Sequence, residues 1–430
     1  MTEFTLNGYY TLILATLVLL LGRWLVSKIK FLADFNIPEP VAGGLVAAVI
    51  IYCLNLFLGY SFNFYTPLQT ACMLMFFASI GLSADFSRLR AGGTPLLIFL
   101  VVVSVFIVLQ DALGMSLAAL LGLDPKLGLV AGSIALTGGH GTAGAWGATF
   151  EEKYGIEGAI TLGIACATYG LVAGGIIGGP VARRLINKMG LKPTTSAEAS
   201  TPTPTLQKRS LSGEPAPNTL AHEYEADYSG EEMFEKKSDI VRLITANSAI
   251  ETLALFAMCL AFADVMTMVA KDTWFELPTF VWALGGGVII RNVLTMAFNF
   301  DMFDRSIDVF GNASLSLFLA MALMSLKLWQ LTDLAGPILV ILLAQTVLMV
   351  AYAYFITFRI MGKDYDSAVL AAGHCGFGLG ATPTAIANMQ AVTDRYMPSH
   401  KAFLIVPMVG AFFVDIVNAT VIQIFAALPF

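Results

Sequence analysis

The chain has 430 residues, of which 57% are hydrophobic and 13% are charged, and its formal net charge is −6. Soluble domains carry about 25% charged residues, so this composition excludes a soluble globular protein. The acidic balance argues against a nucleic-acid partner. The apolar residues fall in runs of about 20, the length of a helix that crosses a bilayer, which indicates an integral membrane protein.

The first half of the chain predicts five membrane-crossing helices, at 8–28, 39–60, 67–84, 94–122 and 158–181. Between the fourth and the fifth lies an apolar segment, 127–150, that is rich in glycine and threonine. Its centre reads TGGHGTAGAWG (137–147). Glycine interrupts helices, so we do not expect this segment to form one continuous transmembrane helix.

A polar segment, 185–240, follows and contains PTTSAEASTPTPT. Its composition of Pro, Ser, Thr and Glu cannot bury a core and predicts a flexible linker between an N-terminal unit, 1–184, and a C-terminal unit, 241–430. The second unit again predicts five crossings, at 243–270, 277–298, 306–325, 336–361 and 401–427. It also contains a second broken segment, 366–392, with GHCGFGLGATPTAIAN at 373–388.

The two units resemble each other. IPEPVAGGLVAAVIIY aligns with LPTFVWALGGGVIIRN, which matches Pro38 to Pro278, and LGLDPKLGLVAG aligns with MGKDYDSAVLAA, which matches Asp124 to Asp364. Both offsets are 240, and EEKYG matches TDRYM further on at an offset of 242. Matches in the same order at nearly one offset indicate an internal duplication.

A repeat with an odd number of crossings must enter the membrane in opposite directions in its two copies. With the N-terminus outside, 20 of the 24 Lys and Arg residues face the cytoplasm, and four remain outside: Lys126, Lys153, Lys271 and Lys327. This bias predicts that both termini are outside and that the linker is cytoplasmic. The predicted fold is an all-α polytopic membrane protein with two inverted-topology repeats of five transmembrane helices. Each repeat carries one glycine-rich segment that is either re-entrant or a broken full crossing.

Broken segments at equivalent places in inverted repeats are typical of the binding sites of secondary transporters. A break exposes N–H groups that attract carboxylates and carbonyl groups that suit a hard cation. The alternative is close helix packing through small residues. Asp415 lies deep in the last crossing, where an acid indicates a functional site by default. We expect Asp415 to bind Na+ or an ammonium group, and the alternative is a buried structural hydrogen bond. Asn388 and Asn312 are weaker Na+ candidates, with interhelical hydrogen bonding as their alternative.

Other polar residues carry less information. Asp111 and Glu251 lie nearer the ends of predicted crossings, where a solvated position is expected. His140 and His374 sit in the two glycine clusters, where the alternatives are a hydrogen-bonded structural imidazole and a histidine that titrates or contacts substrate. The five cysteines show no CxxC pair and suggest neither a disulfide framework nor a zinc site. The one HExx stretch, HEYEA in the linker, lacks the second histidine of a metalloprotease, and we expect no enzyme.

Several motifs resemble the family of bacterial sodium/glutamate symporters: GGHGT, GHCGFGLGATPTAIANMQA, VPMVGAFFVDIVNA, IPEPVAGG and GNASLSLFLAMALM. The resemblance covers nearly the whole chain outside the linker. It implies sodium-coupled uptake of L-glutamate across the bacterial cytoplasmic (inner) membrane by an elevator-like alternating-access movement. It also implies a homodimer in membrane lipid, with Na+ as coupling ion and no other cofactor.

The resemblance further implies that both glycine-rich segments line the translocation path. The candidate substrate-binding residues are then Thr137, Gly138, Gly139, His140, Gly141, Thr142, Gly376, Phe377, Gly378, Gly380, Thr382 and Thr384. Hydroxyls and backbone N–H groups are expected to hold the carboxylates, because no arginine lies clearly at mid-membrane. A symporter of another organic anion, such as a hydroxycarboxylate, and a sodium/proton antiporter stay open as alternatives.

Overall fold

The computed structural model describes residues 2–35, 37–191, 244–271, 273, 277–298, 300, 302–325 and 334–428. Within this part of the chain, nine helices are long and apolar enough to cross a membrane. The prediction of a helical, polytopic membrane protein is therefore confirmed. The predicted linker lies outside the described residues from 192 onward.

The long helices follow the predicted crossings closely. They are α1 (Gly8–Lys28), α3 (Glu39–Leu58), α4 (Thr66–Ser83), α5 (Phe86–Leu120), α8 (Ala159–Met189), α9 (Ala246–Ala270), α10 (Thr279–Phe298), α11 (Asp304–Met324) and α12 (Ala335–Tyr352). A short α2 (Lys30–Asp34) follows α1, and α12 continues through a π-helical turn, Ala353–Thr357, into α13 (Phe358–Ile360). Within α5, Gly93 leaves the helical conformation (φ +63°), so its spanning part is Gly93–Leu120.

Three local features differ from the prediction. Helix α8 runs to Met189, so the first residues of the predicted linker are helical, because Val181, Leu185 and Ile186 recur at helical spacing and are buried. The tenth predicted crossing is α16 (His400–Met408), a π-helical turn, Val409–Phe413, and α17 (Val414–Ala426) in direct succession. Two short parallel strands, β1 (Thr2–Thr5) and β2 (Tyr60–Asn63), pair the start of the chain with the α3–α4 connection.

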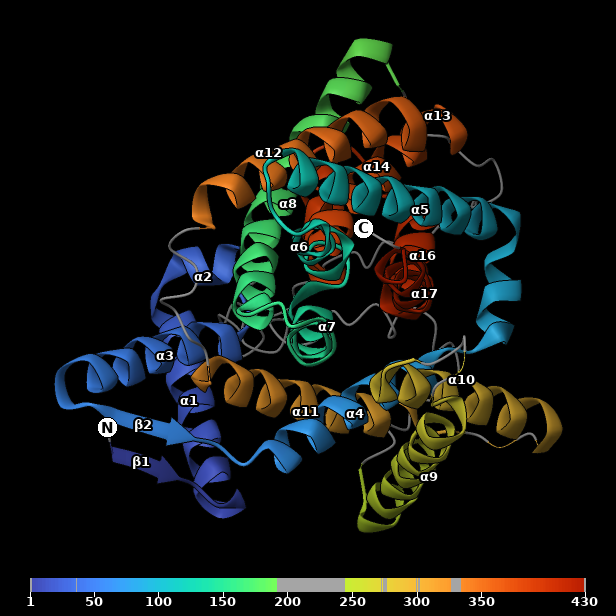
Figure 1. The fold of residues 1–430 in the computed structure, drawn as a ribbon. Coiled ribbons are helices and arrows are strands. Elements are labelled where there is room, and N and C mark those ends of the chain that lie inside the picture. The colour runs from blue at the N-terminus through green and yellow to red at the C-terminus, as the bar shows by residue number, and fades with distance from the viewer. Residues whose placement is uncertain are drawn as a thin grey trace, which may run out of the picture.

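The helices form two packed groups (Figure 1). We call α1, α3, α4, α9, α10 and α11 the base layer; in it α4 packs against α10 and α11, and α3 packs against α1 and α11. The second group, the hairpin body, contains α5 to α8 and α12 to α17. It holds most of the largest buried hydrophobic cluster. The two groups pack against each other, because Phe77, Phe280 and Leu284 of the base layer belong to this same cluster.

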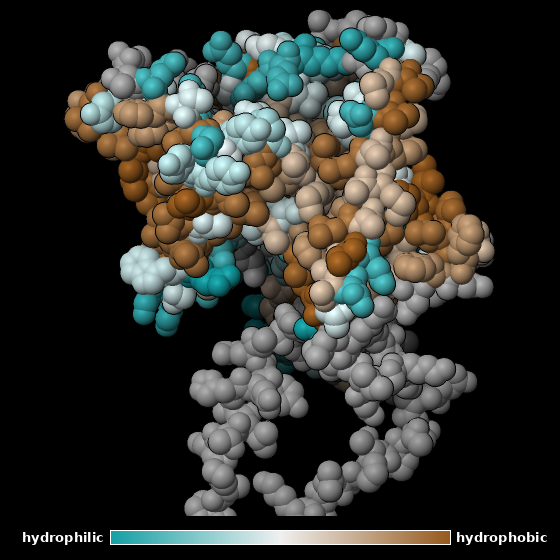
Figure 2. Space-filling model, turned by 90° about the horizontal axis from the view of Figure 1, so that it is seen from below, coloured by the Kyte–Doolittle hydropathy of each residue, from teal (hydrophilic) through white to brown (hydrophobic). Residues whose placement is uncertain are grey.

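The outer surface is apolar where a membrane would surround it. Figure 2 shows a hydrophobic belt between hydrophilic regions above and below it. Large apolar side chains are exposed on helices of both groups, including Leu17 of α1, Val265 of α9 and Val347 of α12. Water would make such exposure unfavourable, and lipid removes that cost.

The residues matched at an offset of 240 occupy equivalent places at helix starts. The Pro38 carbonyl accepts hydrogen bonds from the first turn of α3, and the Pro278 carbonyl accepts the same pair from the first turn of α10. Asp124 caps α6 (Pro125–Leu129), and Asp364 caps α14 (Tyr365–Leu379), each through its carboxylate oxygen and a backbone N–H. The residues of each pair therefore stand at the starts of equivalent helices in the two halves of the chain.

Candidate functional site

The first broken segment is a pair of helical arms, which we call hairpin 1 (residues 125–154). One arm is α6 with a π-helical turn, Val130–Ile134, in which Gly132 departs from helical geometry (φ −101°, ψ −130°). The other arm is α7 (Gly139–Tyr154), which begins at Gly139 with φ +67°. Both arms contact α8, because a Cβ on Gly163 of α8 would meet Ala143 at 3.1 Å and Val130 at 3.4 Å.

The second broken segment, hairpin 2 (residues 365–393), has the same construction. Helix α14 ends at Leu379, Gly380 breaks the helix (φ −136°, ψ −98°), and α15 (Thr382–Thr393) follows. A Cβ on Gly376 would lie 2.4 Å from Ala385 Cα, and a Cβ on Gly373 would lie 3.0 Å from the Met389 sulfur. The paired positions run in opposite directions, so the arms of hairpin 2 are antiparallel and in close backbone contact.

The tips of the two hairpins meet. The Thr137 hydroxyl of hairpin 1 lies 3.2 Å from the Gly378 carbonyl oxygen of hairpin 2 and 2.7 Å from Gln110 Oε1 of α5. Gln110 Nε2 donates to the same Gly378 carbonyl at 3.1 Å. A Cβ on Gly139 would lie 3.5 Å from the Gly380 carbonyl oxygen. One buried amide side chain thus joins both tips, and the sequence contained no signal that singled out Gln110.

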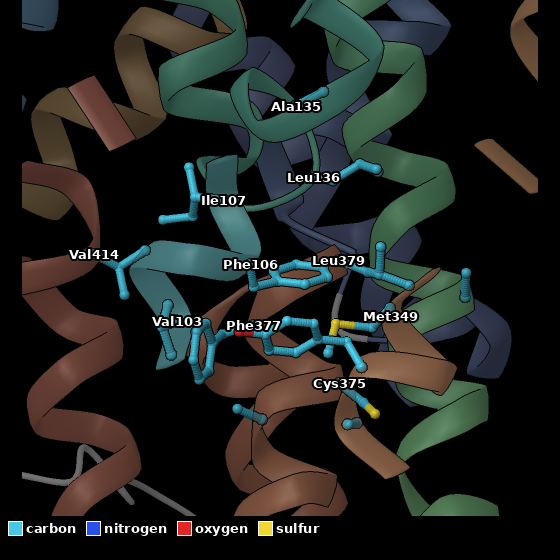
Figure 3. Packing of buried hydrophobic residues seen from close by; sticks show 14 of the residues in the cluster. Val103, Phe106, Ile107, Ala135, Leu136, Met349, Cys375, Phe377, Leu379 and Val414 are labelled. Carbon is cyan, nitrogen blue, oxygen red and sulfur yellow. The ribbon is translucent and has the colours of Figure 1, made fainter. Parts of the chain in front are cut away.

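Apolar side chains surround this contact. Figure 3 shows Phe377 and Leu379 of hairpin 2 close to Phe106 of α5, with Leu136 of hairpin 1 nearby. Helix α8 passes both tips at Gly170, where an added Cβ would lie 1.9 Å from the Leu379 carbonyl oxygen and 2.9 Å from Leu136 Cδ2. The absence of a side chain on Gly170 allows α8 to approach both tips.

The remaining candidates in hairpin 1 contact α8 and the base layer. His140 Nε2 lies 3.0 Å from the Thr168 hydroxyl of α8, and Thr142 is buried. Gly141 faces the base layer, since its Cβ would lie 2.6 Å from Phe76 of α4. Gly138 packs against the side chain of Thr142 in the same turn. Thr137 is thus the hairpin 1 candidate that reaches hairpin 2 through a hydrogen bond.

In hairpin 2 the candidate side chains spread along the start of α15. Thr382 donates to the Gly410 carbonyl at 2.9 Å, and Asn388 donates to the Gly174 carbonyl of α8 at 2.9 Å. Thr384 is buried, and its hydroxyl has no hydrogen-bond partner in the described residues. Phe377 stacks on His374, with ring centroids 5.2 Å apart, and His374 Nδ1 lies 2.9 Å from the Thr357 hydroxyl.

A cavity of about 200 Å³ reaches this part of hairpin 2. It is lined by Asp34, Phe35, Leu171, Gly175, Thr384, Ala387, Asn388 and Ala391. Two sequence-derived candidates, Thr384 and Asn388, therefore share one cavity, which lies between the end of α2, the middle of α8 and α15. Asp34, at the end of α2, adds a charged residue to this lining.

The cation candidates lie in different places. Asp415 is half-buried on α17, directly after the π-helical turn. The same broken helix touches hairpin 2 through Gly410 and hairpin 1 through Asn418, whose Nδ2 donates to the Ser133 carbonyl at 3.2 Å. Asn312, in contrast, is exposed on α11 of the base layer. The structure thus places Asp415 on a helix that joins both hairpins, and Asn312 outside that group.

One expectation was wrong. Asp111 was expected to be solvated near a crossing end, but its side chain is fully buried in α5. Both of its carboxylate oxygens accept hydrogen bonds of 2.9 Å from Ser133, one from the backbone N–H and one from the hydroxyl. Hairpin 1 folds back against α5 and covers Asp111. The expectation considered only how near Asp111 lies to the end of its helix, and this does not show which segment packs over it.

The chain is similar to a described family and to several curated relatives. The family model for "Sodium/glutamate symporter" matches residues 4–216 and 214–398. Proteins named sodium/glutamate symporter from Escherichia coli (strain K12) and Shigella flexneri are each 51% identical to it over 426 residues, which is 99% of both chains. One from Haemophilus influenzae (strain ATCC 51907 / DSM 11121 / KW20 / Rd) is 51% identical over 422 residues, or 98% of each chain.

Proposed function

This chain belongs to the sodium/glutamate symporter family, and we propose that it carries L-glutamate together with Na+ into the cell across the bacterial cytoplasmic membrane. The relatives' names, which are those of transporters, supply the substrate and the ion. The observation that carries the proposal is the meeting of two broken helical hairpins at Gln110, Thr137 and Gly378. Substrate sites of carriers built from inverted repeats are typically formed where such interrupted helices meet.

The tips suit a substrate with two carboxylates. Helix α7 begins at Gly139 and α15 begins at Thr382, so two helix N-termini lie beside the tip contact. The first N–H groups of a helix lack partners within the helix and carry partial positive charge. We assign the carboxylates to these N–H groups and to the hydroxyls of Thr137, Thr142, Thr382 and Thr384. The neighbouring candidate glycines let the substrate approach the backbone.

The substrate ammonium and the coupling ion need oxygen ligands. The Gly378 carbonyl lies at the tip contact, and Asp415 provides a negative charge on the helix that joins both hairpins. We propose Asp415 as a Na+ ligand, with Asn388 and Asn312 as further candidates. The cavity at Thr384 and Asn388 would be the access route from the cytoplasm, because the charge bias places Asp34 on that side.

Alternating access would proceed by movement of the hairpin body against the base layer. The contacts between them include Phe76 with Gly141, Phe318 with Gly144, and the rings of Phe280 and Trp146, whose centroids are 5.4 Å apart. Apolar contacts of this kind are not directional, so they can be exchanged without leaving hydrogen bonds unmade. This elevator-like movement would carry both tips together, with the base layer held in a homodimer.

The topology is part of the same proposal. Two inverted repeats, joined by a cytoplasmic linker over 185–240, would place both termini outside the membrane and the hairpins as re-entrant segments from opposite faces. The offset of 240 between equivalent helix caps supports the duplication. The positive-inside rule supports the orientation.

Labelled-glutamate uptake into proteoliposomes tests the function, with inward gradients of Na+, Li+, K+ and H+ compared at equal ionic strength. We expect saturable uptake that requires Na+. Uptake without a sodium gradient, or no uptake of glutamate under any gradient, would refute the proposal. Competition by unlabelled hydroxycarboxylates tests the rival anion symporter, and sodium flux without any organic substrate tests the antiporter.

A further inference from the structure

Asp111 is a carboxylate without a counter-ion at membrane depth. Its side chain is 0% exposed, and its hydrogen-bond donors are the backbone N–H and hydroxyl of one residue, Ser133. Among the described residues no Lys, Arg or His pairs with it. A buried ionised carboxylate needs a compensating positive charge, and two neutral donors do not supply one.

Two buried amide oxygens near Asp111 also lack partners. Asn418 Oδ1 of α17 and Gln345 Oε1 of α12 have no hydrogen-bond partner in the described residues, although both side chains are at most 1% exposed. Each amide is held by its nitrogen: Asn418 donates to the Ser133 carbonyl, and Gln345 donates to the Gln110 carbonyl at 2.7 Å. Buried polar atoms are nearly always paired, so two orphaned oxygens in one cluster need an explanation.

The cluster is centred on the break in hairpin 1. A Cβ on Gly132 would lie 3.0 Å from Asp111 Oδ1 and 3.7 Å from Gln345 Nε2, so both side chains lie beside this residue. Gly132 is where the arm leaves helical geometry, and Ser133 follows it. A carboxylate, two amide oxygens and the carbonyls of an interrupted helix are all oxygen donors, the ligand type that hard cations prefer.

We propose that Asp111, Asn418 and Gln345 form a sodium site at the Gly132–Ser133 break, in addition to the one assigned to Asp415. The inference rests on the proposed sodium coupling and names a second place for the ion. Sodium supplies the missing positive charge and binds the orphaned oxygens. Two sites of one charge each would also let a carrier of singly negative glutamate move net positive charge inward.

The location explains how this ion would assist substrate binding. Asp111 is next to Gln110, whose side chain contacts Thr137 and Gly378 at the two tips. An ion that draws Asp111, Asn418 and Gln345 toward Ser133 fixes the arm of hairpin 1 that leads to Thr137. Binding of sodium here would therefore order the tip contact before glutamate arrives, and glutamate would in turn tighten sodium binding by the reciprocity of linked sites.

The test measures sodium binding without transport. Purified full-length protein in detergent, without glutamate, is titrated with NaCl against choline chloride at constant ionic strength, and both the melting temperature and bound radioactive sodium are recorded. In Asp111→Asn we expect one ion fewer per chain, or a half-saturating sodium concentration higher by about tenfold or more, the scale on which groups around metal sites act. Asp264→Asn, an exposed acid on α9, is the matched control and should titrate like the wild type.

The outcomes separate the site from the function. If neither the melting temperature nor the bound sodium of the wild type changes with NaCl, the proposed sodium coupling and this site are both refuted. A wild-type response that persists unchanged in Asp111→Asn overturns the site alone. The same holds if Asp111→Asn changes only the pH dependence, because Asp111 would then carry a proton. If Asp111→Asn does not fold, Asn418→Leu replaces it: weaker sodium binding supports the site, and an unchanged titration refutes it.

Discussion

Replacing Gly170 by alanine tests the point where α8 contacts both hairpin tips. The added Cβ would lie 1.9 Å from the Leu379 carbonyl oxygen, and real Cβ contacts essentially never fall below 3.0 Å. Hairpin 2 and α8 must therefore separate by about 1 Å at this point. Leu136 of hairpin 1, at 2.9 Å, is also crowded. Overpacking of this kind destabilises a core by about 1–3 kcal/mol.

The same substitution should also lower transport activity. Gly378 is one residue from Leu379, so the shift moves the Gly378 carbonyl away from Thr137 and Gln110, whose contacts are 3.2 and 3.1 Å long. A site misplaced by about 1 Å can lose activity by about 100-fold, and we expect the initial rate of glutamate uptake to fall at least tenfold.

Gly179→Ala is the matched control in the same helix. Among the described residues, the one neighbour of its Cβ would be Arg183 Nη2, at 4.0 Å. Alanine is the better helix former by about 1 kcal/mol, so this variant should be as stable as the wild type or more so, with normal uptake. Both variants are compared by initial rates in proteoliposomes and by melting temperature in detergent. Wild-type uptake and an unchanged melting temperature in Gly170→Ala would refute the close approach of α8 to the tips.

Four further outcomes are expected. An inside-negative potential should accelerate sodium-driven uptake, because coupling to two or more sodium ions would outweigh the one glutamate charge, and each charge is worth about 2.3 kcal/mol per 100 mV; slower uptake would contradict this coupling. Asp415→Asn should raise the sodium concentration for half-maximal uptake, and an unchanged value assigns Asp415 a structural role. On a background without the native cysteines, Glu152→Cys should react with an impermeant thiol reagent from outside and Asp394→Cys only from inside; labelling from one side excludes inverted repeats. Gly81→Ala, whose Cβ would lie 2.1 Å from the Leu284 carbonyl oxygen, should lower the melting temperature, whereas Gly336→Ala, with no atom of the described residues within 4 Å, should not.

The sequence by itself determined the class of protein and the position of nearly every helix. Long apolar runs, capping residues and helix-breaking glycines act on neighbouring residues of the chain, so their effects can be predicted without knowing the tertiary structure. The match of Asp124 to Asp364 is an example, because an N-cap depends only on the turn that follows it. The glycine-rich pattern likewise predicted the positions of both broken segments and indicated their tips as candidate binding residues.

Only the tertiary structure decided which polar groups meet. Gln110 and Asp111 look alike in sequence, as polar residues in an apolar helix, yet one joins the two tips and the other lies against Ser133. Asn418 reaches the same serine from a helix 285 residues further along the chain. Such contacts depend on how the hairpins pack against α5 and α17. Packing is set by the summed shape of many side chains from distant segments, which no local pattern encodes.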